Sequence, residues 1–264
     1  MDKTGPFAQI KAVFFDLDGT LKLSTPSGVD ALVGYMGDLG MPIDEDARRA
    51  AYRFSHEYWS DRDRVEDDME SLGPDSFWEK YIRAQIVAMA MPGYDGEPAP
   101  DAVREINRRF ANEFAPVNHI APDAIELLRR LRTSGLILGL VSNRPLPLAD
   151  AAQRLGVHEY FDFTLAAGEI GSWKPDAGIF LRALEMAGHL EPQQVVYIGD
   201  NYYSDILGAQ QAGLKAVFID PLRAFPEAAT AAFVINELRD LLAYVPAADH
   251  QAAPPESPAS TNPY

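Results

Sequence analysis

The feature that most constrains the fold of this chain is a set of short, almost continuously apolar runs separated by helical patterns. Each run is rich in β-branched or aromatic residues and is bounded by Gly, Pro or Asp, which predicts a buried strand. Because the runs are apolar throughout and do not alternate, we expect a sheet covered on both faces. The predicted strands are residues 12–17, 136–141, 162–166, 195–199 and 215–219.

Helical patterns lie between these runs, and a glycine follows each of them as a stop signal. Alternating strands and helices predict an α/β fold, with a Rossmann-like parallel sheet and right-handed crossovers. The predicted helices are residues 122–134, 176–187 and 204–212.

The stretch from residue 22 to residue 118 interrupts this alternation. It has no convincing strand pattern, so we expect an all-helical domain, 22–118, inserted into an α/β core formed by residues 1–21 and 119–245. Residues 246–264 are rich in Pro, Ala and Ser, which predicts a disordered tail. The helices predicted in the insertion are residues 29–39, 45–60, 76–90 and 101–114, with hinges at 24–28 and 115–118.

Composition narrows the classes of partner. The formal net charge is −16, and such a surface repels nucleic acid, so we expect no nucleic-acid partner. The chain has no cysteine, which excludes disulfides and thiolate metal sites and fits a cytoplasmic protein. We expect no membrane partner and no signal peptide, since no apolar run reaches the length of a membrane span and the N-terminus lacks an apolar segment.

Two carboxylates, Asp16 and Asp18, follow the first predicted strand directly. The carboxyl ends of parallel strands are where open α/β sheets bind ligands, and alternate residues share a face, so both carboxylates are expected in one site. Gly19 allows the chain to leave the strand sharply.

Other polar residues follow later strands or precede a helix. Taken singly they are weak signals, because a Ser-Asn turn is common and a lysine is more often solvated. These residues are Ser142, Asn143, Lys174, Asp200 and Asp205.

The sequence Asp-x-Asp-Gly-Thr at residues 16–20 resembles the first motif of the haloacid dehalogenase (HAD) superfamily. Ser142-Asn143, Lys174 and Gly199-Asp200 with Asp205 resemble the second, third and fourth motifs, in the order of the family. The resemblance covers about residues 10–22 and 118–235, while the insertion matches a family cap only in its placement and helical character. It implies a magnesium-dependent phosphatase, an enzyme of the phosphoric monoester hydrolase type, that acts on a small phosphorylated metabolite.

The resemblance also implies roles for these residues. Asp16 would attack phosphorus and form an aspartyl-phosphate, and Asp18 would protonate the leaving oxygen and then activate water. Asp16, Asp200 and the backbone carbonyl of Asp18 would bind Mg²⁺, with Asp205 next to that shell. The residues implied in binding the substrate phosphate are Thr20, Ser142, Asn143 and Lys174.

Some other activities of the family need residues that differ from those of this chain. A haloacid dehalogenase would lack the magnesium site and the acid at Asp18, because halide needs no proton to leave. A phosphonate hydrolase would need a cap lysine, and apart from Lys22 near the hinge the insertion offers only Lys80, which we interpret as a surface residue. A phosphomutase of the same family, or a non-catalytic HAD-fold interaction protein, stays open as the alternative.

Substrate choice is expected to depend on residues around the motifs. Arg144, directly after Ser142-Asn143, and the insertion residues Arg62 and Arg64 are the candidates for specificity. The sequence identifies neither the natural ester nor the oligomeric state. Further candidates in the insertion are Arg53, His56, Tyr58 and Trp59, whereas His119 at the hinge is interpreted as structural.

Overall fold

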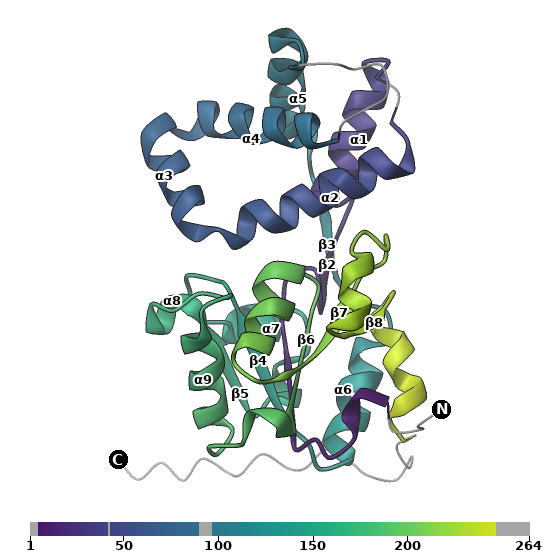
Figure 1. Ribbon diagram of the computed structural model, residues 1–264, viewed down its shortest axis with the longest axis vertical. Coiled ribbons are helices and arrows are strands. Elements are labelled where there is room, and N and C mark those ends of the chain that lie inside the picture. Colours follow the sequence, from purple (N-terminus) through teal and green to yellow (C-terminus); the bar gives the residue numbers. More distant parts are fainter. Residues whose placement is uncertain (1–4, 42, 90–96, 247–264) are drawn as a thin grey trace.

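A computed structural model of the chain describes residues 5–41, 43–89 and 97–246. Within these ranges, six parallel strands form one sheet in the order β5-β4-β1-β6-β7-β8 (Figure 1). The predicted α/β fold is confirmed, and so are the five predicted core strands. The strands are β1 (Ala12–Phe15), β4 (Ile137–Ser142), β5 (Phe163–Ala166), β6 (Val195–Gly199), β7 (Lys215–Ile219) and β8 (Phe233–Ile235).

Helices cover both faces of this sheet, because successive side chains of each strand point to opposite sides. Val13 and Phe15 of β1 belong to a buried cluster that includes α6 and α7, while Ala12 and Phe14 belong to another that includes α9 and α10. The helices of the sheet domain are α6 (Ala124–Thr133), α7 (Ala149–Arg154), α8 (Ala167–Ile170), α9 (Ala177–Met186), the π-helical turn η4 (Tyr202–Leu207) and α10 (Gly208–Gln211). Its 3₁₀ segments are η1 (Gly5–Phe7), η2 (His158–Tyr160), η3 (Pro192–Gln194), η5 (Pro226–Thr230) and η6 (Leu238–Tyr244).

The helices α1 to α5 form a second body above the carboxyl edge of the sheet, which we call the helical insertion (Figure 1). Its own apolar cluster includes Leu32, Met36, Ile82 and Ile106. The four helices predicted here are confirmed, and α3 is an additional one. Their bounds are α1 (Gly28–Asp38), α2 (Glu45–Ser60), α3 (Arg62–Leu72), α4 (Pro74–Ala88) and α5 (Pro100–Glu113).

An antiparallel ribbon joins the helical insertion to the sheet. Strand β2 (Lys22–Thr25) pairs with β3 (Val117–Ile120), so the expectation of no strand between residues 22 and 118 is wrong. Both strands are short and none of their residues is buried, and they therefore lack the apolar run that identifies a core strand. The division into two domains at these residues stays a prediction, and the predicted tail lies, apart from Pro246, outside the described residues.

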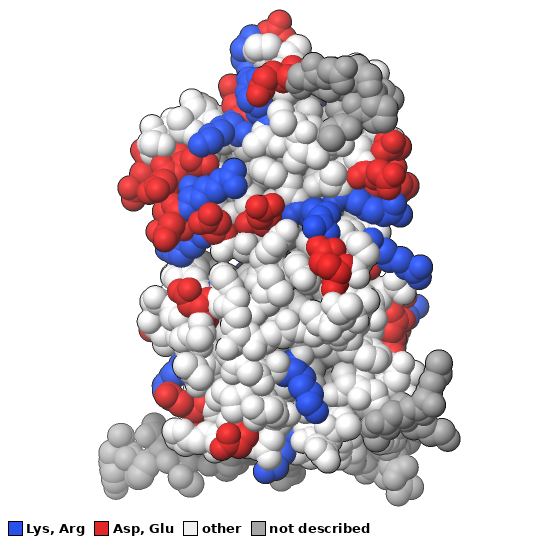
Figure 2. Space-filling view, in the orientation of Figure 1, with Lys and Arg blue, Asp and Glu red and all other residues white. Residues whose placement is uncertain are grey.

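Helix α2 of the insertion docks on the segment that follows β7. Arg49 Nε donates to the Leu222 carbonyl at 2.9 Å and Arg53 to the Ala224 carbonyl at 2.7 Å. Arg53 also pairs with Glu227 at 2.7 Å. Figure 2 shows charged side chains concentrated over the insertion and along its boundary with the sheet.

Among the described residues, no helix is both long and apolar enough to cross a membrane.

Candidate active site

The order of the strands brings the sequence-predicted residues to one edge of the sheet. Strand β1 pairs on one side with β4 and on the other with β6, with Phe15 level with Leu140 and Ile198. The residues that follow these three strands therefore emerge side by side. The main-chain amide of Asp16 donates to the Ile198 carbonyl at 2.9 Å, which fixes Asp16 against the strand that leads into Asp200.

Lys174 lies at the centre of this edge with only 2% of its side chain exposed. Its ammonium group donates to Asp16 Oδ1 at 2.6 Å, to Asp205 Oδ1 at 2.6 Å and to the Tyr197 hydroxyl at 2.8 Å. The three bonds use all three ammonium hydrogens. Burial disfavours the charge, but the two carboxylates outweigh it and raise the pKa of Lys174 well above its ordinary value. The lysine is therefore a fixed positive charge beside Asp16.

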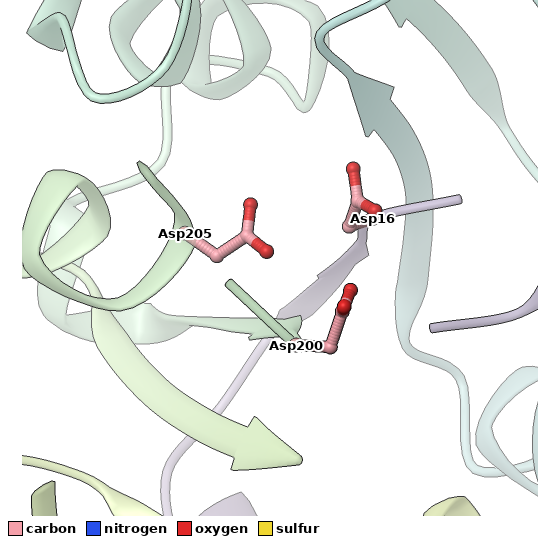
Figure 3. A group of neighbouring side chains, drawn as sticks. All are labelled: Asp16, Asp200 and Asp205. Carbon is pink, nitrogen blue, oxygen red and sulfur yellow. The ribbon is translucent and has the colours of Figure 1, made fainter. Parts of the chain in front are cut away.

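Three carboxylates converge on one point next to this lysine. Asp16, Asp200 and Asp205 each offer an oxygen atom within 4.8 Å of the others, and Figure 3 shows the side chains reaching toward a common space from different elements. Burial raises the pKa of Asp16 to about 7, and Lys174 opposes this rise while Asp205 adds to it. Burial, together with the charges of Asp205 and Asp16, raises the pKa of Asp200 well above its ordinary value.

The donor set has the chemistry of a divalent metal site. When the three carboxylates are ionised, the one ammonium group of Lys174 leaves two negative charges without compensation. Buried charge of this kind is stable only when it is paired or bound to a metal. The donors are hard oxygens, which Mg²⁺ and Ca²⁺ prefer. These residues therefore fit a bound divalent cation.

Two glycines allow this close approach of main chain to carboxylate. Gly19 has φ +87°, and a Cβ at this position would overlap the Asp200 carboxylate. A Cβ at Gly199 would overlap the carboxylate of Asp205. Only glycine leaves room for both carboxylates at these positions, and the left-handed φ of Gly19 adds a second reason there.

The side chains of Thr20 and Asn143 support other residues of the site. The Thr20 hydroxyl donates to Asp200 Oδ1 at 3.0 Å. The Asn143 amide accepts from the Lys174 main-chain nitrogen at 2.7 Å and donates to its carbonyl at 2.8 Å, so it fixes the backbone that carries the lysine. Ser142 ends β4 in a buried position. The predicted role of all three in phosphate binding stays a prediction.

Asp18 lies apart from the buried carboxylates and pairs with two cations. Arg144 Nε donates to Asp18 Oδ2 at 2.6 Å, and its terminal nitrogen donates to Oδ1 at 2.7 Å. Lys22 Nζ also donates to Oδ1, at 2.7 Å. Although partial burial raises it, these hydrogen bonds bring the pKa of Asp18 below its usual value. The carboxyl is therefore ionised and fully engaged in this arrangement.

Comparison with known proteins identifies the family. The family model for a haloacid dehalogenase-like hydrolase matches residues 10–213. This chain belongs to the haloacid dehalogenase-like hydrolase family. The identity expected from the four motifs is thereby confirmed at the level of the family.

Curated relatives of this HAD-like hydrolase are named as phosphatases or, in one case, as a nucleotidase. The glyceraldehyde 3-phosphate phosphatase of Methanothermobacter thermautotrophicus is 28% identical over 220 residues, which cover 80% of this chain and 86% of that protein. The phosphoglycolate phosphatase of Shigella sonnei is 29% identical over 219 residues, 80% of this chain and 81% of that protein. The pyrimidine 5'-nucleotidase YjjG of Escherichia coli is 32% identical over 139 residues, but these cover only 52% of this chain and 61% of the nucleotidase.

Solved structures share the fold of this HAD-like hydrolase. An L-2-haloacid dehalogenase matches with a TM-score of 0.54 and 24% identity, covering 89% of this chain and 98% of that one. A predicted phosphoglycolate phosphatase from Haemophilus somnus matches with a TM-score of 0.50 and 21% identity, covering 89% and 97%. At these identities the likeness establishes the fold alone, so it does not separate a dehalogenase from a phosphatase.

The predicted specificity residues of the insertion, Arg62 and Arg64, lie in helix α3. Arg62 stacks its guanidinium 3.5 Å from the centre of the Trp173 ring and also pairs with Glu66, so it contacts the residue that precedes Lys174. Arg64 lies 4.7 Å from the centre of the Tyr58 ring, within the insertion. The role of both arginines in specificity stays a prediction.

The other candidates of the insertion pack inside it or against the sheet domain. Tyr58 is buried and donates to Asp68 at 2.8 Å, and Trp59 donates to the Tyr81 hydroxyl at 3.1 Å. The His56 ring is buried beside Tyr52. Arg53 docks α2 as described above, Lys80 is half exposed and pairs with Asp68 at 2.5 Å, and His119 is a half-buried residue of β3.

Two residues of the site were not predicted from the sequence. Tyr197 accepts from Lys174 and donates to the Val141 carbonyl at 2.9 Å; its signal is a tyrosine in an otherwise aliphatic strand. The Asn201 main-chain amide donates to Asp205 Oδ2 at 2.9 Å. Its side chain accepts from the amide of Ser204 and donates to the His56 carbonyl at 3.1 Å, so it links the turn η4 to helix α2.

Proposed function

We propose that this chain is a magnesium-dependent phosphatase that hydrolyses a small-molecule phosphate monoester through an aspartyl-phosphate on Asp16. The observation that carries the proposal is the pairing of Lys174 with Asp16 and Asp205 beside Asp200. Relatives that match most of this chain are named as phosphatases, which supports the same class of reaction.

The metal would be held by Asp16, Asp200 and the main-chain carbonyl of Asp18, with Asp205 beside them. Bound Mg²⁺ supplies positive charge to the oxygens of the transferring phosphoryl group. The convergence of three carboxylates, with the single ammonium group of Lys174 beside them, supports a divalent ion at this position. The Thr20 hydroxyl, through its bond to Asp200 Oδ1, orients one of these ligands.

Asp16 acts as the nucleophile. Lys174 binds its Oδ1 and keeps the carboxylate oriented, which leaves Oδ2 to attack phosphorus in line with the leaving oxygen. The bond between phosphorus and the leaving oxygen breaks. Asp18, which takes up a proton from solvent once Arg144 and Lys22 no longer hold it ionised, gives that proton to the leaving oxygen. The Ser142 hydroxyl and the Asn143 main-chain amide bind oxygens of the phosphoryl group, together with Lys174.

Hydrolysis of the intermediate returns the site to its starting state. Asp18, now a carboxylate, takes a proton from water, and the water oxygen attacks phosphorus. The bond between Asp16 and phosphorus breaks, so inorganic phosphate leaves and both carboxyl groups return to their original protonation. Asp18 must leave Arg144 and Lys22 to perform these steps, since both of its oxygens are engaged with them.

The helical insertion serves as a cap that closes over the site. It reaches the sheet through the ribbon β2–β3 and contacts it through Arg49, Arg53 and Arg62. Closure would exclude water from the reaction and bring side chains of the insertion to the leaving group. Arg62 and Arg64 remain the candidates for this recognition.

A phosphate-release screen tests the proposal. The full chain is assayed with 4-nitrophenyl phosphate, sugar phosphates, nucleotides and phosphorylated acids, with Mg²⁺ and after exhaustive chelation. We expect phosphate release that depends on Mg²⁺, and no halide release from 2-haloacids. Undiminished release after chelation would refute the metal assignment, and an isomerised phosphate ester without free phosphate would identify a mutase. No reaction with any ester would favour a non-catalytic role.

A further inference from the structure

Two cations, Arg144 and Lys22, bind the carboxylate of Asp18. Arg144 follows β4 and Lys22 opens β2, so they approach Asp18 from different elements. Both are largely shielded, with 31% of the Arg144 side chain and 22% of the Lys22 side chain exposed. These three side chains together carry one more positive than negative charge, within an otherwise strongly acidic protein.

The phosphatase mechanism would separate this carboxylate from its partners. Among the residues that the structure describes, Asp18 Oδ2 accepts from Arg144 alone, while Oδ1 accepts from both cations. To reach the leaving oxygen, the Asp18 carboxylate must break its two hydrogen bonds with the Arg144 guanidinium. Two cations that are shielded from most of the solvent would then lose their charged acceptor, and hydrogen bonds to charged groups are among the stronger ones. An anion of the substrate would restore both contacts in the position that Asp18 leaves.

The geometry of the bidentate pair between Arg144 and Asp18 indicates the chemical class of that anion. Arg144 holds the Asp18 carboxylate through two parallel bonds of 2.6 and 2.7 Å. A guanidinium presents its donors at the spacing of carboxylate and phosphate oxygens, and such bidentate pairs are specific as well as strong. A neutral hydroxyl or amide cannot replace a carboxylate on both cations.

We propose that the leaving group of the natural substrate carries its own anionic group, a carboxylate or a second phosphate, which replaces Asp18 on Arg144 and Lys22. This rests on the proposed phosphatase function. The substrate thus releases Asp18 for its work on the leaving oxygen, and esters without the second anion do not. Because Asp18 must still reach the scissile bond, the anionic group lies a few bonds from it.

A second arginine close to Arg144 supplies a control for it. Arg144 and Arg154 both line a cavity of about 530 Å³ with Leu146 and Asp150, and neither Asp18 nor Lys22 lines this cavity. Arg154 is exposed and, among the described residues, forms no ion pair. It is therefore a matched control: an arginine of the same cavity that does not contact the carboxylates of the site.

The test compares two pairs of esters in which one member carries a second anion on the leaving group and the other does not. The phosphate ester of 3-hydroxypropanoate is compared with that of 3-hydroxypropanamide, and propane-1,3-diol bisphosphate with the monophosphate. The amide has the shape of the carboxylate and is the slightly better leaving group, so intrinsic reactivity opposes the expected result. We measure kcat/KM for all four with Mg²⁺, for the wild-type chain, Arg144→Met and Arg154→Met.

We expect the wild-type chain to favour the anionic member of at least one pair by about 10- to 100-fold, the range that a charged hydrogen-bonding pair contributes. The pair with the larger ratio identifies a carboxylate or a phosphate as the second anion. Arg144→Met should bring that ratio close to one, while Arg154→Met should retain it. The wild-type ratio needs no variant, so it tests the inference even if Arg144→Met fails to fold.

Three results would overturn the inference. In the first, the wild-type chain turns over neutral and anionic esters alike. In the second, Arg144→Met lowers kcat/KM for all four esters by the same factor, which would assign Arg144 to the transferring phosphoryl group. In both cases phosphate release itself leaves the phosphatase function intact. The third result, no release from these esters or from 4-nitrophenyl phosphate, would overturn the proposed function and the inference together.

Discussion

The raised pKa of Asp16 predicts that the metal-free protein becomes less stable as the pH rises, and that asparagine at position 16 removes this dependence. Burial raises the pKa of Asp16 from 3.8 to about 7, against the opposing effect of Lys174. In the unfolded chain the carboxyl returns to its ordinary value, so between these values the folded state binds the proton more tightly. Stability from this proton is therefore fully present below about pH 4 and is lost as the pH rises through about 7.

The size of the effect follows from the difference in pKa. The difference between a pKa of 3.8 and one of about 7 corresponds to about 4 kcal/mol in full, and the part lost between pH 5 and pH 8 is about 2 to 3 kcal/mol. Burial raises the pKa of Asp200 as well, which adds in the same direction. Asp18 and Glu126 have lowered pKa values, so their contributions have the opposite sign. The difference between wild type and Asp16→Asn cancels the contributions of groups that do not contact residue 16. Loss of the Asp16 charge also lowers the pKa of Asp200, which acts in the same direction.

Denaturant unfolding in EDTA at pH 5 and pH 8 provides the assay. At pH 5 the wild-type carboxyl is largely neutral and resembles the amide, so the two proteins should be similar in stability. At pH 8, Asp16→Asn should be the more stable, and the difference should grow by about 2 to 3 kcal/mol between the two conditions. Asp150→Asn, on the exposed surface, controls for loss of one carboxylate. A difference that stays constant, or an Asp16→Asn variant that is less stable at pH 8, would refute the reasoning.

Other substitutions test single contacts of the site. Gly19→Ala places a Cβ on the Asp200 carboxylate at a left-handed φ, so Mg²⁺ affinity measured by calorimetry should fall at least about tenfold; unchanged affinity would contradict the close approach. Lys174→Met leaves two buried carboxylates unpaired and should lower metal-free stability at pH 8 by about 3 to 5 kcal/mol; a variant as stable as wild type would refute that pairing. Asp18→Asn should slow alkyl phosphates more than 4-nitrophenyl phosphate, because only poor leaving groups need a proton; equal kinetic losses would exclude Asp18 as the acid.

The core of the fold was predictable because its strands are unambiguous. Runs such as residues 195–199 are apolar throughout and end at Gly or Asp, and their bounds agree with β6. The ribbon β2–β3 was not predictable, because its residues are half exposed and pair across nearly a hundred positions of sequence. Helix α3 was missed for a related reason: its sequence RDRVEDDMESL is polar on almost every side and buries only Val65 and Asp68.

The candidate site was predictable in its residues but not in its contacts. Motif order placed Asp16, Lys174 and Asp200 at strand ends or before a helix, and pairing in the sheet brings them together. The bond between Arg144 and Asp18 joins residues 126 positions apart, so no local pattern signals it. Tyr197 was read as a strand residue, because only the fold shows that its hydroxyl reaches Lys174.

Chemical trapping of the intermediate tests the central claim, that Asp16 is the nucleophile, most directly. The full chain is mixed with Mg²⁺ and excess 4-nitrophenyl phosphate, quenched in acid within milliseconds and treated with borohydride, which reduces an acyl phosphate to an alcohol. Peptide mass spectrometry should locate homoserine at position 16 in the wild-type chain, and Asp16→Asn should show neither the label nor turnover. Rapid turnover without any label, or a label at Asp18 instead, would contradict the account.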